Sequence, residues 1–174
     1  MTVPMLVAVQ AGEEDALIAA AARGDRGAFG ELYVRYSRMV HGILLTRVPP
    51  ADAEDLVQDV FMTAMDRVGD LRTAAAFRPW LATIARNRAM DFYRGRRRGP
   101  VEVPQSAAPN QGAFAVLDAI RSLPAAYSET LILRLVEGMT GPEIAKQTGL
   151  TPESVRVNLC RGMKMLRELL GEKR

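Results

Sequence analysis

The segment FRPWLATIARNRAMDFYRGRRR (residues 77–98) carries an aromatic ring, an amide and several guanidinium groups at helical spacing. Trp80, Asn87 and Arg94 follow one another at steps of seven residues, so they lie along one flank of a helix. An indole can stack on a base, an amide can hydrogen-bond to a base edge, and a guanidinium can neutralise a phosphate. The same spacing also fits a simpler arrangement, in which Trp80 belongs to the core and the arginines form a solvated face.

The positive charge around this flank favours nucleic-acid binding over a solvated face. Arg96, Arg97 and Arg98 extend the charge beyond Arg94, and Arg86 lies further round the same helix. A basic cluster of this density beside an aromatic residue is more typical of nucleic-acid binding than of a device for solubility. We therefore expect this segment to contact bases and phosphates.

The other face of this helix must be buried if the flank is to be held in place. Its apolar residues gather on one stripe, which comprises Phe77, Leu81, Ile84, Ala85 and Phe92. The composition of the whole chain favours such helices, because 48% of its 174 residues are hydrophobic while only 6% are aromatic. Convincing alternation with period two is missing, so the sequence predicts an all-α protein.

A linker divides the predicted helices into two groups. Residues 99–112, GPVEVPQSAAPNQG, contain three prolines and two glycines, which is typical of a semi-extended connection. We expect a flexible N-terminal tail over residues 1–12, one small helical domain over residues 13–98 and a second over residues 113–174.

Charge is strongly segregated along the chain, although the net charge is only +3. Acidic residues gather between Asp52 and Asp70, and basic residues lie from Arg86 to Arg98 and again after Arg156. Segregation of this kind predicts separate surfaces for partners of opposite charge.

Several classes of function are disfavoured. The single cysteine, Cys160, excludes an internal disulfide framework and fits a reducing cytoplasm. His41 is the only histidine, so we expect a surface or partly packed ring and no metal site. The chain has no apolar run of about 18 residues and no export signal, so we expect no membrane insertion. It also has no nucleophile–base pair and no glycine-rich phosphate loop, so we expect neither an enzyme nor a cofactor.

The helix expected from Asp52 to Val68 has two contrasting faces. One face is apolar, and the other is an acidic row that comprises Asp52, Asp55, Asp59 and Asp66 together with Met62, with Gln58 at its edge. A solvated face is one alternative, and acids favoured by the helix dipole are another, although the dipole reaches only the first turn. A metal site would lack a histidine partner. A docking face for a basic partner accounts for the whole row.

The second domain ends in the spacing of a helix-turn-helix. Thr140, Pro142 and Glu143 form a capping box that opens a short helix, which Gly149 ends. Thr151 then caps a longer helix that begins with a proline. A purely structural pair of antiparallel helices is the alternative.

The longer helix of this motif has an inward apolar stripe, and its other positions are free to face a partner. The outward positions are Glu153, Ser154, Val157, Arg161 and Lys164, with Arg156 and Asn158 on the two flanks. Short polar side chains near the N-terminal end suit base edges, and cations further along suit phosphates. We therefore predict that this helix reads duplex DNA.

Three segments in this order resemble the extracytoplasmic-function (ECF) subfamily of bacterial sigma factors: DAEDLVQDVF, FRPWLATIARNRAMDFYRGRRR and GMTGPEIAKQTGLTPESVRVNLCRGMKML. The resemblance covers residues 16 to about 170. It implies that the first domain binds the clamp helices of the largest subunit of core RNA polymerase and opens the minus-ten promoter element. It implies that the second domain contacts the polymerase flap and reads the minus-thirty-five element. An anti-sigma factor and a cytoplasmic location are also implied.

The resemblance also implies roles for single positions. The resemblance assigns core-polymerase binding to Asp55, Gln58, Asp59 and Met62, in agreement with the acidic row. It assigns contacts with minus-ten bases to Trp80, Asn87 and Arg94. It assigns contacts with the nearby phosphates to Arg86, Arg96, Arg97 and Arg98. It assigns binding of minus-thirty-five DNA to Glu153, Ser154, Arg156, Val157, Asn158, Arg161 and Lys164.

Two stretches differ from the common pattern of the subfamily. Residues 72–76, RTAAA, replace a polar loop that contains glycine, and Val157 and Asn158 stand where a serine and an arginine are common. Both differences bear on which promoter sequence is preferred. The alternative function is a free-standing helix-turn-helix regulator that binds duplex DNA as a dimer, but such a protein would leave the acidic row unexplained.

Overall fold

The computed structural model describes residues 3–96 and 111–171, with side chains described for residues 12–95 and 115–171. Within these ranges the regular structure is helical throughout, which confirms the predicted fold class. The α-helices are α1 (Val3–Ala22), α2 (Arg26–Leu45), α3 (Pro50–Arg67), α4 (Phe77–Arg96), α5 (Gln111–Ser122), α6 (Ala125–Leu135), α7 (Gly141–Thr148) and α8 (Pro152–Leu169). Two 3-10 helices, Val68–Asp70 and Ala74–Ala76, connect α3 to α4.

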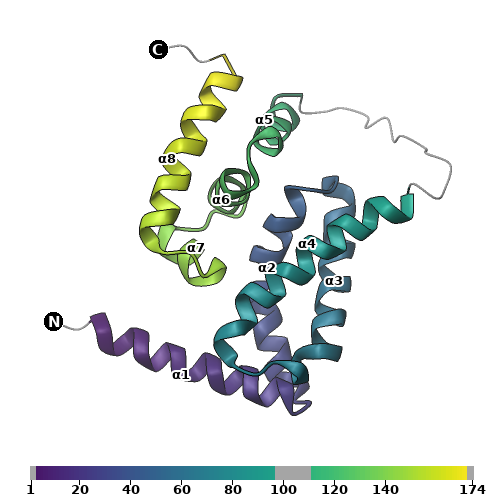
Figure 1. Ribbon diagram of the computed structural model, residues 1–174, viewed down its shortest axis with the longest axis vertical. Coiled ribbons are helices and arrows are strands. Elements are labelled where there is room, and N and C mark those ends of the chain that lie inside the picture. The colour runs from purple at the N-terminus through teal and green to yellow at the C-terminus, as the bar shows by residue number, and fades with distance from the viewer. Residues whose placement is uncertain (1–2, 97–110, 172–174) are drawn as a thin grey trace.

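The helices form two regions, α1–α4 and α5–α8, and α2 lies where the regions meet (Figure 1). Within its own region α2 contacts α1, α3 and α4, and across the boundary it contacts α6 and α7. The buried apolar residues of both regions form one continuous cluster. The relative placement of the two regions is therefore set by packing on α2.

The start of α2 follows from local chemistry. Asp25 is the N-cap, and its Oδ1 accepts hydrogen bonds from the backbone N–H groups of Gly27 at 2.9 Å and Ala28 at 3.0 Å. Gly24 precedes it with φ +91°, a left-handed conformation that residues with a Cβ rarely adopt. The chain can therefore turn sharply between α1 and α2.

The first helix is longer than the sequence analysis expected. We predicted a loose tail up to residue 12 and a helix from Glu13, but α1 begins at Val3. Pro4 falls in the first turn, where the N–H that proline lacks would have no partner in the helix. The residues that follow contain no further proline, so the local sequence allows the helix to begin as early as Val3.

A buried carboxylate fastens α1 to the helices behind it. The Glu14 side chain is only 3% exposed, and its Oε1 accepts hydrogen bonds from Arg78 Nε at 2.8 Å, from Arg78 Nη2 at 2.7 Å and from the Tyr36 hydroxyl. Arg35 adds an ion pair, with Nη1 3.8 Å from Glu14 Oε2. Burial raises the pKa of Tyr36, and the hydrogen bond to Glu14 raises it further. The cluster thus joins α1, α2 and α4.

The apolar stripe of α4 is buried as predicted. Phe77, Leu81 and Ala85 are fully buried, and the rings of Phe77 and Tyr36 meet edge-on with their centroids 5.5 Å apart. Phe92, further along, is half-buried against the core. This anchoring fixes which flank of α4 faces outward.

The predicted linker lies almost wholly outside the described residues. It was expected to span residues 99–112, whereas α5 begins at Gln111. No helix among the described residues combines the length and the apolar character needed to cross a membrane.

Candidate nucleic-acid interface

The outer face of α3 presents the predicted acidic row. Asp55 and Gln58 are exposed, and Met62 leaves 63% of its surface open between exposed carboxylates. The inner face is buried through residues such as Val57 and Val60. The outer face of α3 thus combines exposed carboxylates with one exposed apolar side chain.

Asp59 of this row has a partner within the protein. Its Oδ2 accepts hydrogen bonds from Arg88 Nη2 at 2.7 Å and from Arg88 Nε at 3.2 Å. Arg88 belongs to α4, so this contact links the row to the predicted DNA-binding helix.

The flank of α4 carries Trp80, Asn87 and Arg94. Asn87 and Arg94 are exposed, whereas Trp80 is half-buried, with its ring centroid 5.9 Å from that of Phe77. One part of the indole therefore packs against the core, and the other part remains exposed to solvent. Arg94 makes an ion pair with Asp91, with Nη1 3.4 Å from Oδ1, and is otherwise largely exposed. The side chain of Arg96, and Arg97 and Arg98 altogether, lie outside the described residues.

Arg86 lies apart from this flank and contacts the second helical region. Its Nε is 3.1 Å from Glu129 Oε1 and its Nη2 is 2.8 Å from Glu129 Oε2. Arg47 Nη1 adds a third hydrogen bond to Glu129 Oε1 at 2.8 Å. The hydrogen bond to Glu129 raises the pKa of Arg86. Burial alone would raise the pKa of Glu129, but the two arginines outweigh it and lower this pKa below its usual value.

The helix-turn-helix has the local features that the sequence predicts. Thr140 and Glu143 cap each other, with Thr140 N donating to Glu143 Oε2 at 2.7 Å. Gly149 ends α7 with φ +75°, a value that favours glycine. Thr151 caps α8 by accepting a hydrogen bond from Ser154 N at 3.1 Å. The two caps and Gly149 therefore define the turn between α7 and α8.

The surface of α8 follows the expected pattern with two differences. Glu153, Arg156, Arg161 and Lys164 are exposed, and Ser154 is partly exposed. Val157 was expected to face outward but is half-buried, and Asn158, which was expected on a flank, is also half-buried. Asn158 Nδ2 lies 3.5 Å from Thr130 Oγ1, a long contact with α6. This contact between α8 and α6 partly covers Asn158, one of the two positions that differ from the ECF pattern.

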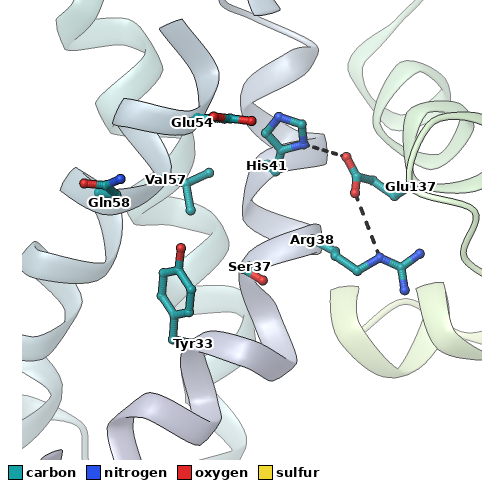
Figure 2. Close-up of a pocket in the computed structure, with 8 residues that line it drawn as sticks. All are labelled: Tyr33, Ser37, Arg38, His41, Glu54, Val57, Gln58 and Glu137. Atoms are coloured by element: carbon teal, nitrogen blue, oxygen red, sulfur yellow. Dashed lines mark hydrogen bonds and ion pairs between the residues drawn. The ribbon is translucent and has the colours of Figure 1, made fainter.

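A second contact between the regions was not foreseen in the sequence. Figure 2 shows Glu137, which follows α6, reaching His41 and Arg38 of α2. His41 Nδ1 is 2.7 Å from Glu137 Oε1, and Arg38 Nε is 4.0 Å from Glu137 Oε2. The hydrogen bond to Glu137 raises the pKa of His41 above its usual 6.5. The pair is separated by 96 residues, and no local signal marks it.

The Glu137–His41 contact borders a pocket of about 310 Å³ between α2, α3 and the loop after α6 (Figure 2). Tyr33, Val57 and Gln58 line its other side. Among the described residues no group of histidine, cysteine, aspartate or glutamate side chains is arranged to hold a metal ion.

Two family matches follow the chain in order. Residues 32–99 match Sigma-70 region 2, and residues 113–166 match Sigma-70, region 4. The first match contains α3 and α4, and the second contains the helix-turn-helix.

Whole-length relatives agree with the family matches. The chain is 36% identical over 161 residues to the RNA polymerase sigma factor CarQ of Myxococcus xanthus, covering 86% of this chain and 92% of CarQ. It is 32% identical over 181 residues to the RNA polymerase sigma factor CnrH of Cupriavidus metallidurans, covering 88% of this chain and 92% of CnrH. The structure of CnrH in complex with the cytosolic domain of CnrY superimposes with a TM-score of 0.61 at 27% identity, covering 92% of this chain and 99% of that one. The chain therefore belongs to the extracytoplasmic-function group of bacterial RNA polymerase sigma factors.

Proposed function

We propose that α3 is the surface by which this sigma factor binds the clamp helices of core RNA polymerase. The contacting residues are Asp55, Gln58, Asp59 and Met62. The observation that carries this assignment is the exposure of Met62, 63% open, between the carboxylates of one helix face. An apolar side chain within an acidic face can pack against a partner helix while the carboxylates meet its basic residues.

The flank of α4 binds the unpaired strand of the minus-ten element. Extruding a base from the stack costs a few kcal/mol, and stacking it on an aromatic ring returns about 1–3 kcal/mol. Trp80 has an open part for such stacking, and Asn87 and Arg94 are exposed beside it. Arg86, Arg96, Arg97 and Arg98 are assigned to the neighbouring phosphates, so that strand opening is stabilised by bases and backbone together.

The N-terminal part of α8 reads the minus-thirty-five element in the major groove. Glu153, Ser154, Val157 and Asn158 lie near the start of the helix, where side chains reach base edges. Arg156, Arg161 and Lys164 are exposed and suit phosphate contacts. The second region also contacts the polymerase flap, as the subfamily resemblance implies.

An anti-sigma factor is the proposed regulatory partner, and the cytoplasm is the proposed location. CnrH was solved in complex with the cytosolic domain of CnrY, and its similarity to this chain supports a partner of the same kind. The sigma factor has no chemistry of its own, since polymerase makes the RNA.

Reconstitution with core polymerase tests these assignments. The chain is mixed with bacterial core polymerase and genomic DNA fragments, and the 5′ ends of the transcripts are mapped. We expect co-elution with core and start sites that share one minus-ten and one minus-thirty-five sequence. A chain that binds duplex DNA as a dimer and leaves core polymerase unbound would instead be a free-standing helix-turn-helix regulator, and the proposal would be wrong.

A further inference from the structure

Two buried oxygen atoms that lack a hydrogen-bond donor belong to side chains of one pocket. Among the residues that the structure describes, no donor forms a hydrogen bond with Glu14 Oε2 or with Gln147 Oε1, although both atoms are buried. Both side chains line a pocket of about 320 Å³ between α1, α2 and α7. Buried acceptors almost always have a donor, so two such atoms in one pocket indicate a site for a group that donates hydrogen bonds.

The Glu14 carboxylate uses only one of its two oxygens within the protein. Its side chain is 3% exposed, and Oε1 accepts hydrogen bonds from Arg78 and from the Tyr36 hydroxyl. Oε2 has an ion pair with Arg35, but Arg35 Nη1 lies 3.8 Å away, which is too far for a hydrogen bond. The second oxygen therefore keeps its capacity to accept.

The orientation of the Gln147 amide is set by its contact with α2. Gln147 Nε2 donates to the carbonyl oxygen of Arg35 at 3.0 Å. Because a carbonyl oxygen can accept but not donate, the amide nitrogen must face it, and Oε1 is the atom left without a partner. The unpaired oxygen is thus a consequence of how α7 packs on α2.

The charges of the pocket favour a cationic ligand over an anionic one. The pocket is lined by three carboxylates, those of Glu13, Glu14 and Glu143, and by the cations of Arg35 and Lys146. An anion would leave both unpaired oxygens without a donor and would lie near the buried carboxylate. A positively charged N–H group supplies donors and forms the strongest hydrogen bonds with a carboxylate.

We infer that this pocket binds a small aliphatic amine, whose ammonium or guanidinium group donates to Glu14 Oε2 and Gln147 Oε1. Glu13 and Glu143 are exposed, so their carboxylates attract a cation towards the pocket. None of the residues that line the pocket is assigned to polymerase or promoter DNA, so the site is separate from the proposed surfaces.

A nuclear magnetic resonance titration of the ¹⁵N-labelled full-length chain tests the site. The probes are butylammonium, butylguanidinium and, as the matched control, butyltrimethylammonium, which has the same charge and the same alkyl chain but no N–H donor. At constant ionic strength, the first two should shift the side-chain amide signals of Gln147 in a saturable manner, and the control should bind at least about tenfold more weakly. The stronger of the two amines identifies the preferred head group.

Two variants locate the binding. Gln147→Leu removes one acceptor and should lower the amine affinity by about tenfold, the effect of one hydrogen bond to a charged group; its readout is the backbone amide signal of Tyr36. Glu13→Gln removes an exposed carboxylate of the pocket and should also lower the affinity. Glu31→Gln is the control, because it removes an exposed carboxylate of α2 that does not line this pocket.

The outcomes separate a hydrogen-bonded site from water and from general charge attraction. No saturable shift with either amine would show that water alone fills the pocket, and the inference would be wrong. Equal binding of butyltrimethylammonium, or unchanged affinity in a folded Gln147→Leu chain, would overturn it as well. If Gln147→Leu does not fold, Glu13→Gln against Glu31→Gln decides the location. The proposed function is tested by transcription with core polymerase, so it stands or fails independently of these titrations.

Discussion

Asp59 of α3 and Arg88 of α4 form an ion pair, with Arg88 Nη2 2.7 Å from Asp59 Oδ2. The side chains are 42% and 43% exposed, so water screens the pair and its contribution to stability is at most about 1 kcal/mol. Its importance is positional. It connects the proposed polymerase surface with the proposed DNA-binding helix, and the shared buried core holds α3 and α4 together.

The first prediction concerns the acidic row. Changing both Asp55 and Asp59 to Lys should abolish association with core polymerase, because two carboxylates that face a basic partner become cations. Loss of the Arg88 pair should lower the midpoint of thermal unfolding by only a few degrees, about the effect of 1 kcal/mol. Co-elution with core and circular dichroism measure the two effects.

The control for the acidic row is Asp15→Lys, which makes the same charge change at an exposed position of α1. It should leave core binding intact. Normal core affinity in a folded Asp55→Lys, Asp59→Lys variant would contradict the assignment of α3.

The second prediction concerns strand opening. Asn87→Ala should slow formation of the open complex on an ordinary promoter, because it removes one hydrogen bond to an unpaired base. The rate should recover on a template already mismatched across the minus-ten element. Potassium permanganate footprinting or a fluorescent base follows the opening. If the mismatched template brings no recovery, Asn87 has no part in melting.

Trp80→Ala is a less specific test of the same surface. Its indole also packs on Phe77, with the ring centroids 5.9 Å apart, so its removal weakens the core as well. We expect a loss of up to about 3 kcal/mol in the free energy of unfolding, measured by denaturant titration, together with the opening defect. A variant as stable as the parent chain would show that the indole makes no important core contact.

The third prediction concerns the choice of minus-thirty-five sequence. Asparagine pairs through its amide with adenine, whereas arginine favours guanine. Asn158→Arg should therefore change the preferred base at one position by about 1–3 kcal/mol. In the parent chain, the Asn158 amide must first leave Thr130, because Asn158 Nδ2 lies 3.5 Å from Thr130 Oγ1. Selection from a randomised minus-thirty-five library reports the preference.

Arg161→Ala and Lys164→Ala are the matched comparisons for Asn158. They should weaken binding to all sequences alike and reduce the slope of the salt dependence by about one unit for each phosphate that is no longer neutralised. A set of base preferences that stays the same in Asn158→Arg, with only a lower yield, would rule out base reading by Asn158.

The fourth prediction concerns pH and the contact between the regions. Glu137, mainly through its hydrogen bond, raises the pKa of His41; burial opposes the shift, and the charges of Glu137 and Glu54 support it. Protonated His41 also faces Arg38, which is more exposed and itself lies 4.0 Å from Glu137. A group with a raised pKa stabilises the folded state fully below its ordinary pKa and loses this effect as the pH rises through the raised value.

The free energy of unfolding should therefore fall as the pH rises from below 6.5 through the raised pKa of His41. His41→Gln keeps a hydrogen-bonding side chain but cannot titrate, so it should flatten this part of the profile. A His41→Gln chain with the same pH profile as the parent would show that other groups cause the change.

The fifth prediction concerns the buried cluster that fastens α1. Arg78→Leu leaves the Glu14 carboxylate, only 3% exposed, without its main partner and should cost about 3–5 kcal/mol of unfolding free energy. The double variant Glu14→Leu with Arg78→Leu should recover part of this loss, because the unpaired buried charge is gone. A loss below about 1 kcal/mol in Arg78→Leu would show that Arg78 is not the main partner of the carboxylate.

Local signals in the sequence were enough to predict the helices and most of their boundaries. Thr140 and Thr151 cap the helices that they were expected to cap, and Gly149 ends α7. The buried stripe of α4 follows the spacing of its apolar residues. Capping and periodicity act over a few neighbouring residues, so they can be read along the chain. The predicted start of α1 was wrong because its apolar first residues contain no clear boundary, and Pro4 is tolerated in a first turn.

The pairing of charged groups, in contrast, depends on tertiary packing. Glu14 meets Arg78 across 64 residues, Glu129 meets Arg86 across 43 and His41 meets Glu137 across 96. No local rule selects such partners, since they depend on how α2 packs against both regions. For the same reason the sequence assigned Arg86 to DNA without revealing that an internal carboxylate already binds it. Helix faces are local properties of the chain, whereas the occupant of each face is set by long-range packing.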